Sequence, residues 1–426
     1  MMYDRQIIRR QRDGRFRLTA ADNERAGVWE GKQMKEENLR KLQEILDRAV
    51  ADKEIAGANF CVQKDGREIC YLQSGYGDME RKKELRRDSI FRLYSMTKPI
   101  TAAAVMKLAE EGRLDMGEPV AAFFPSFRGQ TVEEKAGERV PVQRDVTVKD
   151  LMDMTAGLMY PGYAGPAGKE TDKVFVELDR RLFTENPMST EEFAECLGKC
   201  PLAFQPGSGW MYSSCADVLG AIVEKVSGVA FSRYLRENFF EPLGMADTGF
   251  YVPEEKRERL AVTYQTGMEG MEPYRGNHLG IINAMDREPA FASGGAGLVS
   301  TVDDYMRFAH MLLQGGIYDG GRVLEEHTVR FMVNGGLLRN QQLEMEKQFT
   351  HIRGYTYSNL LRILQEEGKA LHMGQAGEYG WDGWLGCYFS NDPRNGISIV
   401  FMTQRKDAGT LPVLRKMKNV LYASCL

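Results

Sequence analysis

Strand-like segments occur near both ends of this 426-residue chain and are scarce between them, and this distribution constrains the fold more than any other feature. Residues 58–73 hold two short apolar runs around an Asp-Gly turn, a pattern typical of a β-hairpin. Residues 385–404 hold two further runs on either side of a Pro-Arg-Asn-Gly turn. Because strands need neighbouring strands for their backbone hydrogen bonds, we expect the two ends to pair into one antiparallel sheet.

Helical patterns fill much of the remaining chain. Apolar residues at helical spacing predict helices over 36–50 and 411–423. An Ala-rich helix is expected over 99–111 and another over 216–226, each stopped by a following glycine. From about residue 115 to about residue 290, helical patterns alternate with long polar or Gly/Pro-rich loops.

These patterns predict an α/β (α+β) fold with an inserted, mainly helical domain. An antiparallel sheet flanked by helices would be built from residues 31–100 and 291–426, and the helical domain would span residues 101–290. Residues 1–30 are predicted to form a polar N-terminal arm.

Composition excludes several classes of function. A hydrophobic fraction of 43% and a charged fraction of 27% are typical of a soluble globular protein. The formal net charge of -4 gives no general attraction to nucleic acid or to an anionic membrane. No apolar run is long enough to span a membrane, and the N-terminal residues lack the apolar core of a secretory signal, so a cytoplasmic location is expected. The five histidines show no ligand spacing, and we predict neither a metal nor an organic cofactor.

Ser95-Met96-Thr97-Lys98 is the first candidate for chemistry. Positions i and i+3 share one face of a helix, so the Ser95 hydroxyl and the Lys98 amine can meet. A serine nucleophile needs a base, and a lysine can serve as one if burial lowers its pKa toward neutrality. Pro99 suits the first turn of a helix, where backbone N–H groups favour a developing oxyanion. The alternative is a chance tetrad on the surface of a helix start.

Tyr212 is the second candidate, on a loop after Pro206-Gly207 and just before a predicted helix. Beside a lysine ammonium, the pKa of Tyr212 is expected to fall, so that the phenol could relay a proton. The alternative is a buried tyrosine, with Ser213 or Ser214 capping the helix that follows.

Gly380-Trp381-Asp382-Gly383-Trp384, ahead of the late strand, is the third candidate. Glycine lets a backbone N–H approach a ligand closely, so this strand edge and Ser95 could together provide an oxyanion hole. The alternative is a Gly-rich turn with tryptophans in the core.

In this order, the motifs resemble the serine β-lactamase and penicillin-binding-protein superfamily. The closest branch holds class C β-lactamases, D,D-peptidases, β-lactamase-like carboxylesterases and polyketide acyltransferases. Four segments are similar to sequence motifs of the family: residues 91–100 (FRLYSMTKPI), 151–158 (LMDMTAGL), 242–248 (PLGMADT) and 294–304 (GGAGLVSTVDD). The resemblance runs from about residue 39 to the C-terminus, with apparent insertions around 127–145 and 340–373.

The resemblance implies roles for individual residues. Ser95 would be the acylated nucleophile, Lys98 its base, and Tyr212 the group that assists proton transfer at the leaving group. The backbone N–H groups of Ser95 and Trp384 would form the oxyanion hole.

The chain departs from the family pattern at two substrate-binding positions. The family's Tyr-x-Asn ends in Ser214, so the amide that contacts the lysine and an acylamino substrate is missing. The family's Lys-Thr-Gly or His-x-Gly triplet reads Trp381-Asp382-Gly383, so an apolar ring and an acid replace a cation that grips a substrate carboxylate. Asp382 is expected to repel such a carboxylate unless its charge is masked.

We therefore predict a serine hydrolase or transesterase that forms an acyl-enzyme at Ser95 and acts on small neutral esters. Two alternatives stay open: a D,D-peptidase or β-lactamase with the same machinery, and a catalytically inactive member with a binding role. The expected partner is a small-molecule ester or amide, not nucleic acid or a membrane, and the sequence leaves the oligomeric state open.

Overall fold

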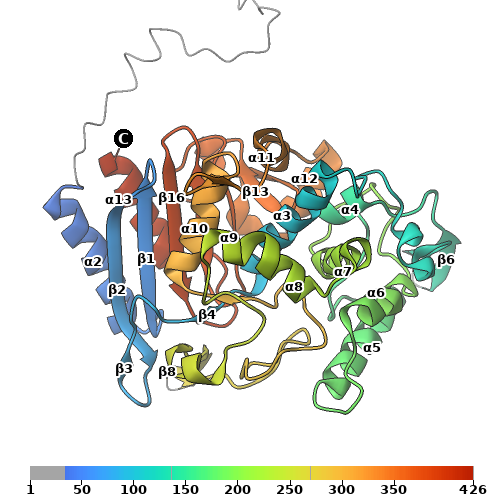
Figure 1. The fold of residues 1–426 in the computed structure, drawn as a ribbon, viewed down its shortest axis with the longest axis horizontal. Coiled ribbons are helices and arrows are strands. Elements are labelled where there is room, and N and C mark those ends of the chain that lie inside the picture. Colours follow the sequence, from blue (N-terminus) through green and yellow to red (C-terminus); the bar gives the residue numbers. More distant parts are fainter. Residues whose placement is uncertain (1–33, 136, 269, 426) are drawn as a thin grey trace, which may run out of the picture.

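A computed structural model describes residues 34–425 apart from residues 136 and 269, so the predicted polar arm over 1–30 lies outside the described residues. The main feature is an eight-stranded antiparallel sheet (Figure 1). Its strands, in spatial order, are β12 (Tyr355–Ser358), β13 (Leu361–Leu364), β14 (Tyr379–Asp382), β15 (Tyr388–Asp392), β16 (Ile397–Thr403), β1 (Gly57–Lys64), β2 (Arg67–Asp78) and β3 (Lys83–Glu84). All eight strands come from the two end regions of the chain, and β1 of one region pairs with β16 of the other.

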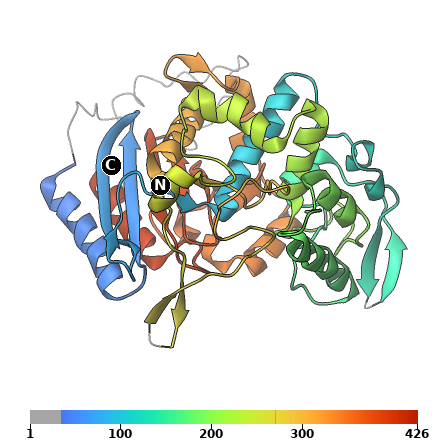
Figure 2. The ribbon, with the colours of Figure 1, turned by 60° about the horizontal axis from the view of Figure 1, so that its bottom comes forward.

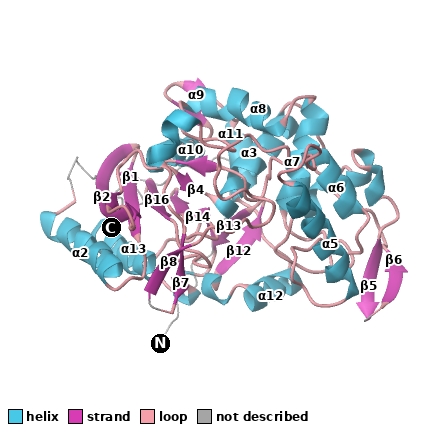
Figure 3. Ribbon diagram, turned by 90° about the horizontal axis from the view of Figure 1, so that it is seen from below, coloured by secondary structure: helices cyan, strands magenta, loops and turns pink. Residues whose placement is uncertain are grey.

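The central strands are apolar on both faces because helices cover both. Phe60 lies opposite Phe401 in the pairing of β1 with β16, and both pack with Val62 beneath α2 (Glu36–Ala51) and α13 (Pro412–Cys425). Cys61, which lies between Phe60 and Val62 in β1, faces the other side of the sheet, which α10 (Val302–Leu313) covers. Such two-sided burial produces nearly continuous apolar strands. Figure 3 shows α2 and α13 side by side against this part of the sheet.

A buried ion pair ties α13 to the start of β14. Lys418 Nζ lies 2.6 Å from Glu378 Oε1, and both side chains are fully buried. The hydroxyl of Tyr422 donates to Glu378, and Lys418 also donates to the Tyr388 hydroxyl. Because each charge has a charged partner and further hydrogen bonds, the pair is compatible with the core and fixes where β14 begins.

Helices occupy the side of the molecule opposite the α2–α13 layer (Figure 1). They are α3 (Thr97–Glu110), α4 (Val148–Met152), α5 (Pro166–Arg181), α6 (Thr190–Gly198), α7 (Cys215–Ser227), α8 (Phe231–Leu235) and α9 (Glu241–Leu243). The buried helix α7 packs against α3, α4 and α6, and it ends at Gly228, whose left-handed φ of 78° suits glycine. Two further helices, α11 (Glu326–Val333) and α12 (Arg339–Gln348), precede β12.

Short strand pairs complete the fold. They are β4 (Phe91–Arg92) with β9 (Val299–Ser300), β5 (Thr131–Lys135) with β6 (Glu138–Pro141), β7 (Tyr264–Gly267) with β8 (Gly270–Pro273), and β10 (Ile317–Tyr318) with β11 (Gly321–Arg322). The β7–β8 hairpin projects from the body of the molecule (olive in Figure 2). In the described part of the chain, no helix is long and apolar enough to cross a bilayer.

The α/β fold class is confirmed, and the structure adds strands that the sequence patterns did not predict, among them two in the main sheet. Strands β12 and β13 lie in the apparent insertion at 340–373 and extend one edge of the main sheet. Each has only four residues, all buried, so neither shows an alternating pattern.

Candidate active site

Ser95 lies where β4 passes into α3. A single 3₁₀ turn over Tyr94–Met96 joins the two elements, and α3 starts at Thr97. Tyr94 has a left-handed φ of 45°, which costs a non-glycine residue about 1–3 kcal/mol. Its ring is buried against Trp384 and His278, with centroid distances of 4.8 and 6.1 Å, and this packing holds the strained turn. Ser95 is thereby presented as a partly exposed residue between buried neighbours.

Lys98 is fully buried directly beneath Ser95. Its Nζ lies 3.2 Å from Ser95 Oγ, 3.1 Å from the Tyr160 hydroxyl and 2.9 Å from the Gly295 carbonyl oxygen. Burial lowers the pKa of Lys98 to about 7, against the opposing effect of the nearby Asp217 carboxylate. A buried amine that is partly neutral at pH 7 can accept a proton from a hydroxyl at this distance.

Tyr212 lies over the same lysine. The Lys98 Nζ is 4.6 Å from the centre of the Tyr212 ring, and the Trp381 indole N–H donates to the Tyr212 hydroxyl at 3.1 Å. The expected fall in the Tyr212 pKa is wrong. Burial raises the pKa of Tyr212 above its usual value, and hydrogen bonds with Ser95 and Trp381 only partly oppose this effect. The phenol is therefore protonated at neutral pH.

Tyr160 is a second tyrosine at the lysine that the sequence analysis missed. Its hydroxyl is the 3.1 Å partner of Lys98, and its ring lies 5.8 Å from that of Tyr212. Burial raises the pKa of Tyr160 well above its usual value, so it also stays neutral. The residue lies two positions after the segment 151–158, and an aromatic residue just before Pro161-Gly162 was the available signal.

Asp217 is a second residue that the sequence analysis missed. It is a buried acid in the apolar helix α7, and its carboxylate accepts from the Gly295 backbone N–H at 3.0 Å and from the Ser293 hydroxyl. The Gly295 carbonyl in turn accepts from Lys98. Burial raises the pKa of Asp217, and Lys98 is the largest opposing influence. A lone acid within an apolar helical run was the sequence signal.

The end of β14 passes against the turn that carries Ser95. A side chain at Gly383 would come within 2.3 Å of the Leu93 carbonyl oxygen, so only glycine fits. The Gly383 N–H bonds to the Cys387 carbonyl oxygen at 2.7 Å, which closes a tight loop around Trp384. The Trp384 side chain is stacked on His278 and donates to Asp407 at 2.6 Å, and these two contacts hold it in place.

Two predicted substrate-binding side chains turn away from Ser95. Asp382 accepts from the buried Arg362 at 3.2 Å and from Thr410. The Arg362 cation therefore masks the negative charge of Asp382, a point that the sequence alone did not decide. Ser214 is fully buried, and its hydroxyl donates to the Met159 carbonyl oxygen at 3.0 Å. Ser214 is the N-cap residue of α7. Neither its side chain nor that of Ser213 bonds to the first backbone N–H groups of the helix, so the expected side-chain cap is wrong.

Helix α12 forms a wall beside Tyr212. Gln348, its last residue, accepts from the Tyr212 backbone N–H at 3.2 Å and donates to the Trp210 carbonyl oxygen at 3.1 Å. Two more amide side chains of α12 bond to the same loop, Asn340 to the Ser208 carbonyl oxygen and Gln341 to that of Gly207.

Aromatic rings line the site beyond Gln348. Phe349 meets Tyr212 edge to face at 5.2 Å between ring centroids, and Tyr357 meets Trp381 at 5.0 Å. His351 lies 5.5 Å from Phe349. Within the described residues, no cluster of His, Cys, Asp or Glu is arranged to hold a metal ion. The side chains packed around Tyr212 are therefore largely aromatic.

Comparisons with known proteins agree with this geometry. The family model described as Beta-lactamase matches residues 42–422. Esterase EstB of Burkholderia gladioli is 30% identical over 401 residues, which cover 90% of this chain and 95% of EstB.

Two solved structures share the fold. EstCE1, described as a hydrolase with promiscuous acyltransferase activity, is 25% identical and superposes with a TM-score of 0.75 over 91% of this chain and 99% of its own. Simvastatin synthase (LovD) of Aspergillus terreus is 21% identical and superposes with a TM-score of 0.74 over 91% of this chain and 98% of its own, a likeness of fold. This protein therefore belongs to the β-lactamase family and is a serine hydrolase.

Proposed function

We propose that the enzyme is a carboxylesterase or acyltransferase that forms an acyl-enzyme at Ser95 and acts on small neutral esters. The observation that carries the proposal is the buried Lys98 amine, 3.2 Å from Ser95 Oγ and with a pKa of about 7. Such an amine is the base that a serine nucleophile needs.

In the proposed acylation, neutral Lys98 takes the proton of Ser95 as Oγ attacks the ester carbonyl carbon. The backbone N–H groups of Ser95 and Trp384 stabilise the negative charge that develops on the carbonyl oxygen. The carbon–oxygen bond of the ester then breaks. Tyr212 donates its phenolic proton to the departing alcohol and regains one from the Lys98 ammonium. Water or an alcohol attacks the acyl-enzyme by the reverse proton path, which restores Ser95.

The proposed preference for neutral esters rests on what surrounds Tyr212. A lysine at position 381 would bring a cation to the substrate, but Trp381 donates a neutral N–H to Tyr212 instead. The ring of Phe349 packs on Tyr212, and the buried ring of Tyr357 packs on Trp381, so both surroundings are apolar. The printed descriptions of EstB as an esterase and of EstCE1 as a hydrolase with acyltransferase activity support the same substrate class.

D,D-peptidase or β-lactamase activity is the second candidate, because the Ser95–Lys98–Tyr212 arrangement suits amides as well as esters. A substrate panel separates the two: p-nitrophenyl esters of increasing acyl length, a chromogenic cephalosporin, and a D-Ala-D-Ala peptide. We expect turnover of short esters, and faster turnover of the cephalosporin or the peptide would contradict the proposal. The absence of an acyl-enzyme with every substrate would contradict both candidates.

A further inference from the structure

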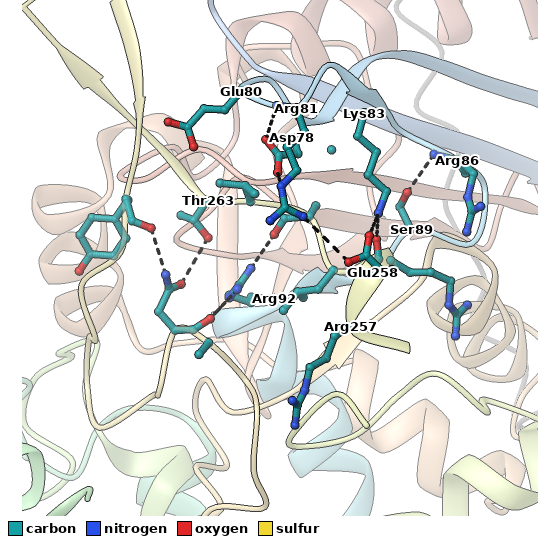
Figure 4. Close-up of a pocket in the computed structure, with 18 of the residues that line it drawn as sticks. Asp78, Glu80, Arg81, Lys83, Arg86, Ser89, Arg92, Arg257, Glu258 and Thr263 are labelled. Carbon is teal, nitrogen blue, oxygen red and sulfur yellow. Dashed lines mark hydrogen bonds and ion pairs between the residues drawn. The ribbon is translucent and has the colours of Figure 1, made fainter. Parts of the chain in front are cut away.

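A cavity of about 500 Å³ has a lining that includes none of Ser95, Lys98 and Tyr212 (Figure 4). The β2–β3 hairpin, residues 86–92, residues 257–263 and residues 274–284 line it. It is strongly charged, because seven cationic and four acidic side chains line it. Two of these cations pair with acids outside the lining, Arg86 with Asp88 at 3.0 Å and Arg259 with Asp247 at 2.8 Å. The surplus of positive charge therefore rests on Arg92 and Arg257.

Most of the acids in this lining are already engaged by cations. Glu258 pairs with Lys83 at 2.9 Å, Glu80 pairs with Arg275 at 3.1 Å, and Asp78 pairs with Arg81 at 3.6 Å. The remaining lining acid, Glu84, is exposed to solvent. These acids are therefore poorly placed to neutralise the other cations of the cavity.

Arg92 is the buried cation of this cavity. It is 5% exposed, and its guanidinium donates to the carbonyl oxygens of Ala261 at 2.7 Å and Asn283 at 2.8 Å and to the Gln404 side chain. Among the described residues, no carboxylate lies within ion-pairing distance of Arg92. Burial lowers the pKa of Arg92 to about 10, because a desolvated guanidinium is less stable as a cation. A buried charge without an opposite charge is costly, and an anion would relieve that cost.

Arg257 supplies a second cation at the mouth of the cavity. Its side chain is exposed and donates to the Asp286 carbonyl oxygen at 2.7 Å, while the nearby Asp286 carboxylate is paired with Arg287. Hydroxyl groups of Ser89 and Thr263 also line the cavity. Planar guanidinium groups are well suited to carboxylate and phosphate oxygens.

We propose that this cavity binds a small organic anion with two or more carboxylate or phosphate groups. One oxyanion would lie beside Arg92 at the inner end, and a second would contact Arg257 at the mouth. The ligand would differ from the proposed neutral ester substrate, and its site would be independent of Ser95.

The test is calorimetric titration with two probes, citrate for carboxylates and inorganic pyrophosphate for phosphates, against potassium chloride at matched ionic strength. The protein carries Ser95→Ala, so that turnover cannot interfere. We expect saturable binding of at least one probe, and the probe that binds identifies the oxyanion. Arg257→Gln should weaken binding at least about tenfold, because a charged hydrogen bond contributes about 1.5–3 kcal/mol. Arg180→Gln, on the exposed face of α5, is the matched control and should bind like the parent.

Three results would overturn the proposal: no saturable binding of either probe, equal binding by Arg257→Gln and the parent, or equal loss in Arg180→Gln. Arg257 is exposed, so its replacement should leave the fold intact. Arg92→Gln is tested in parallel and should abolish binding if its thermal unfolding shows a folded protein.

Discussion

The burial of Lys98 connects the sequence to its chemistry at the scale of one residue. The Ser-x-x-Lys spacing brings the amine to the hydroxyl, but the spacing alone does not make the lysine a base. The dehydrated environment does so, because it disfavours the ammonium form and lowers the pKa of Lys98 to about 7. Two neutral tyrosines, Tyr160 and Tyr212, then surround the amine without adding charge.

The pH dependence of kcat/KM should follow this titration. Below its pKa Lys98 is an ammonium that cannot accept the Ser95 proton, and above its pKa it is a neutral base. We therefore expect kcat/KM for a p-nitrophenyl ester to rise with pH to a plateau, with a midpoint near pH 7. Lys98→Arg cannot deprotonate and should lose about a thousandfold or more in kcat. A flat profile, or a near-native Lys98→Arg enzyme, would show that another group is the base.

Asp217 provides a test with a predicted direction. Its carboxylate raises the pKa of Lys98, so Asp217→Asn should lower that pKa and move the midpoint of the pH profile to lower values. Asp217→Glu, which keeps the charge, is the matched control and should stay closer to the parent midpoint. A midpoint that moves to higher pH, or does not move, in a folded Asp217→Asn protein would contradict the assigned coupling.

Asp382 should matter for stability more than for specificity. It pairs with Arg362, which is 2% exposed, so Asp382→Ala leaves a buried cation without its partner and should cost about 3–5 kcal/mol in urea unfolding. The ratio of kcat/KM for neutral esters to that for a cephalosporin should stay close to the parent. Asp286→Ala, which breaks a surface pair with Arg287, should cost about 1 kcal/mol or less. If Asp382→Ala is as stable as the parent and its ratio of kcat/KM values differs from that of the parent, Asp382 contributes to substrate specificity and not to stability.

At the scale of elements, local signals predicted local structure well. Asp65 and Gly66 have φ values of 50° and 75°, as the turn between two hairpin strands requires, and their sequence alone predicted that hairpin. Strands β12 and β13 were missed because their burial depends on distant neighbours. Tyr160 and Asp217 were missed for the same reason: only the folded chain brings them to Lys98.

Helix α12 illustrates such a non-local role, because its last residue holds the loop of Tyr212. Gln348→Ala removes both backbone hydrogen bonds and should lower kcat about 10- to 100-fold, since a small displacement of a catalytic group is costly. Gln348→Glu keeps an acceptor for the Tyr212 N–H and should recover part of that loss. The neighbouring exposed Lys347→Ala is the control. A Gln348→Ala enzyme within twofold of the parent would contradict the positioning role.

At the scale of the whole molecule, the sequence predicted the architecture from where its strand patterns lie. Both end regions supply the sheet, and β1 joins β16 across it, as expected. The division into a sheet domain and a helical domain at residues 101–290 stays a prediction, as do the cytoplasmic location and the absence of nucleic-acid partners. Family resemblance supplied the residue roles, whereas the environment of Asp382 and Ser214 required the folded chain.

The most direct test of the central claim is to locate the covalent bond. The intact enzyme is treated with a fluorophosphonate, digested and sequenced by mass spectrometry, beside a Ser95→Ala protein of unchanged circular dichroism. We predict a single modified peptide with the adduct on Ser95, and neither labelling nor esterase activity in Ser95→Ala. An adduct on another serine, or full esterase activity in Ser95→Ala, would contradict the account.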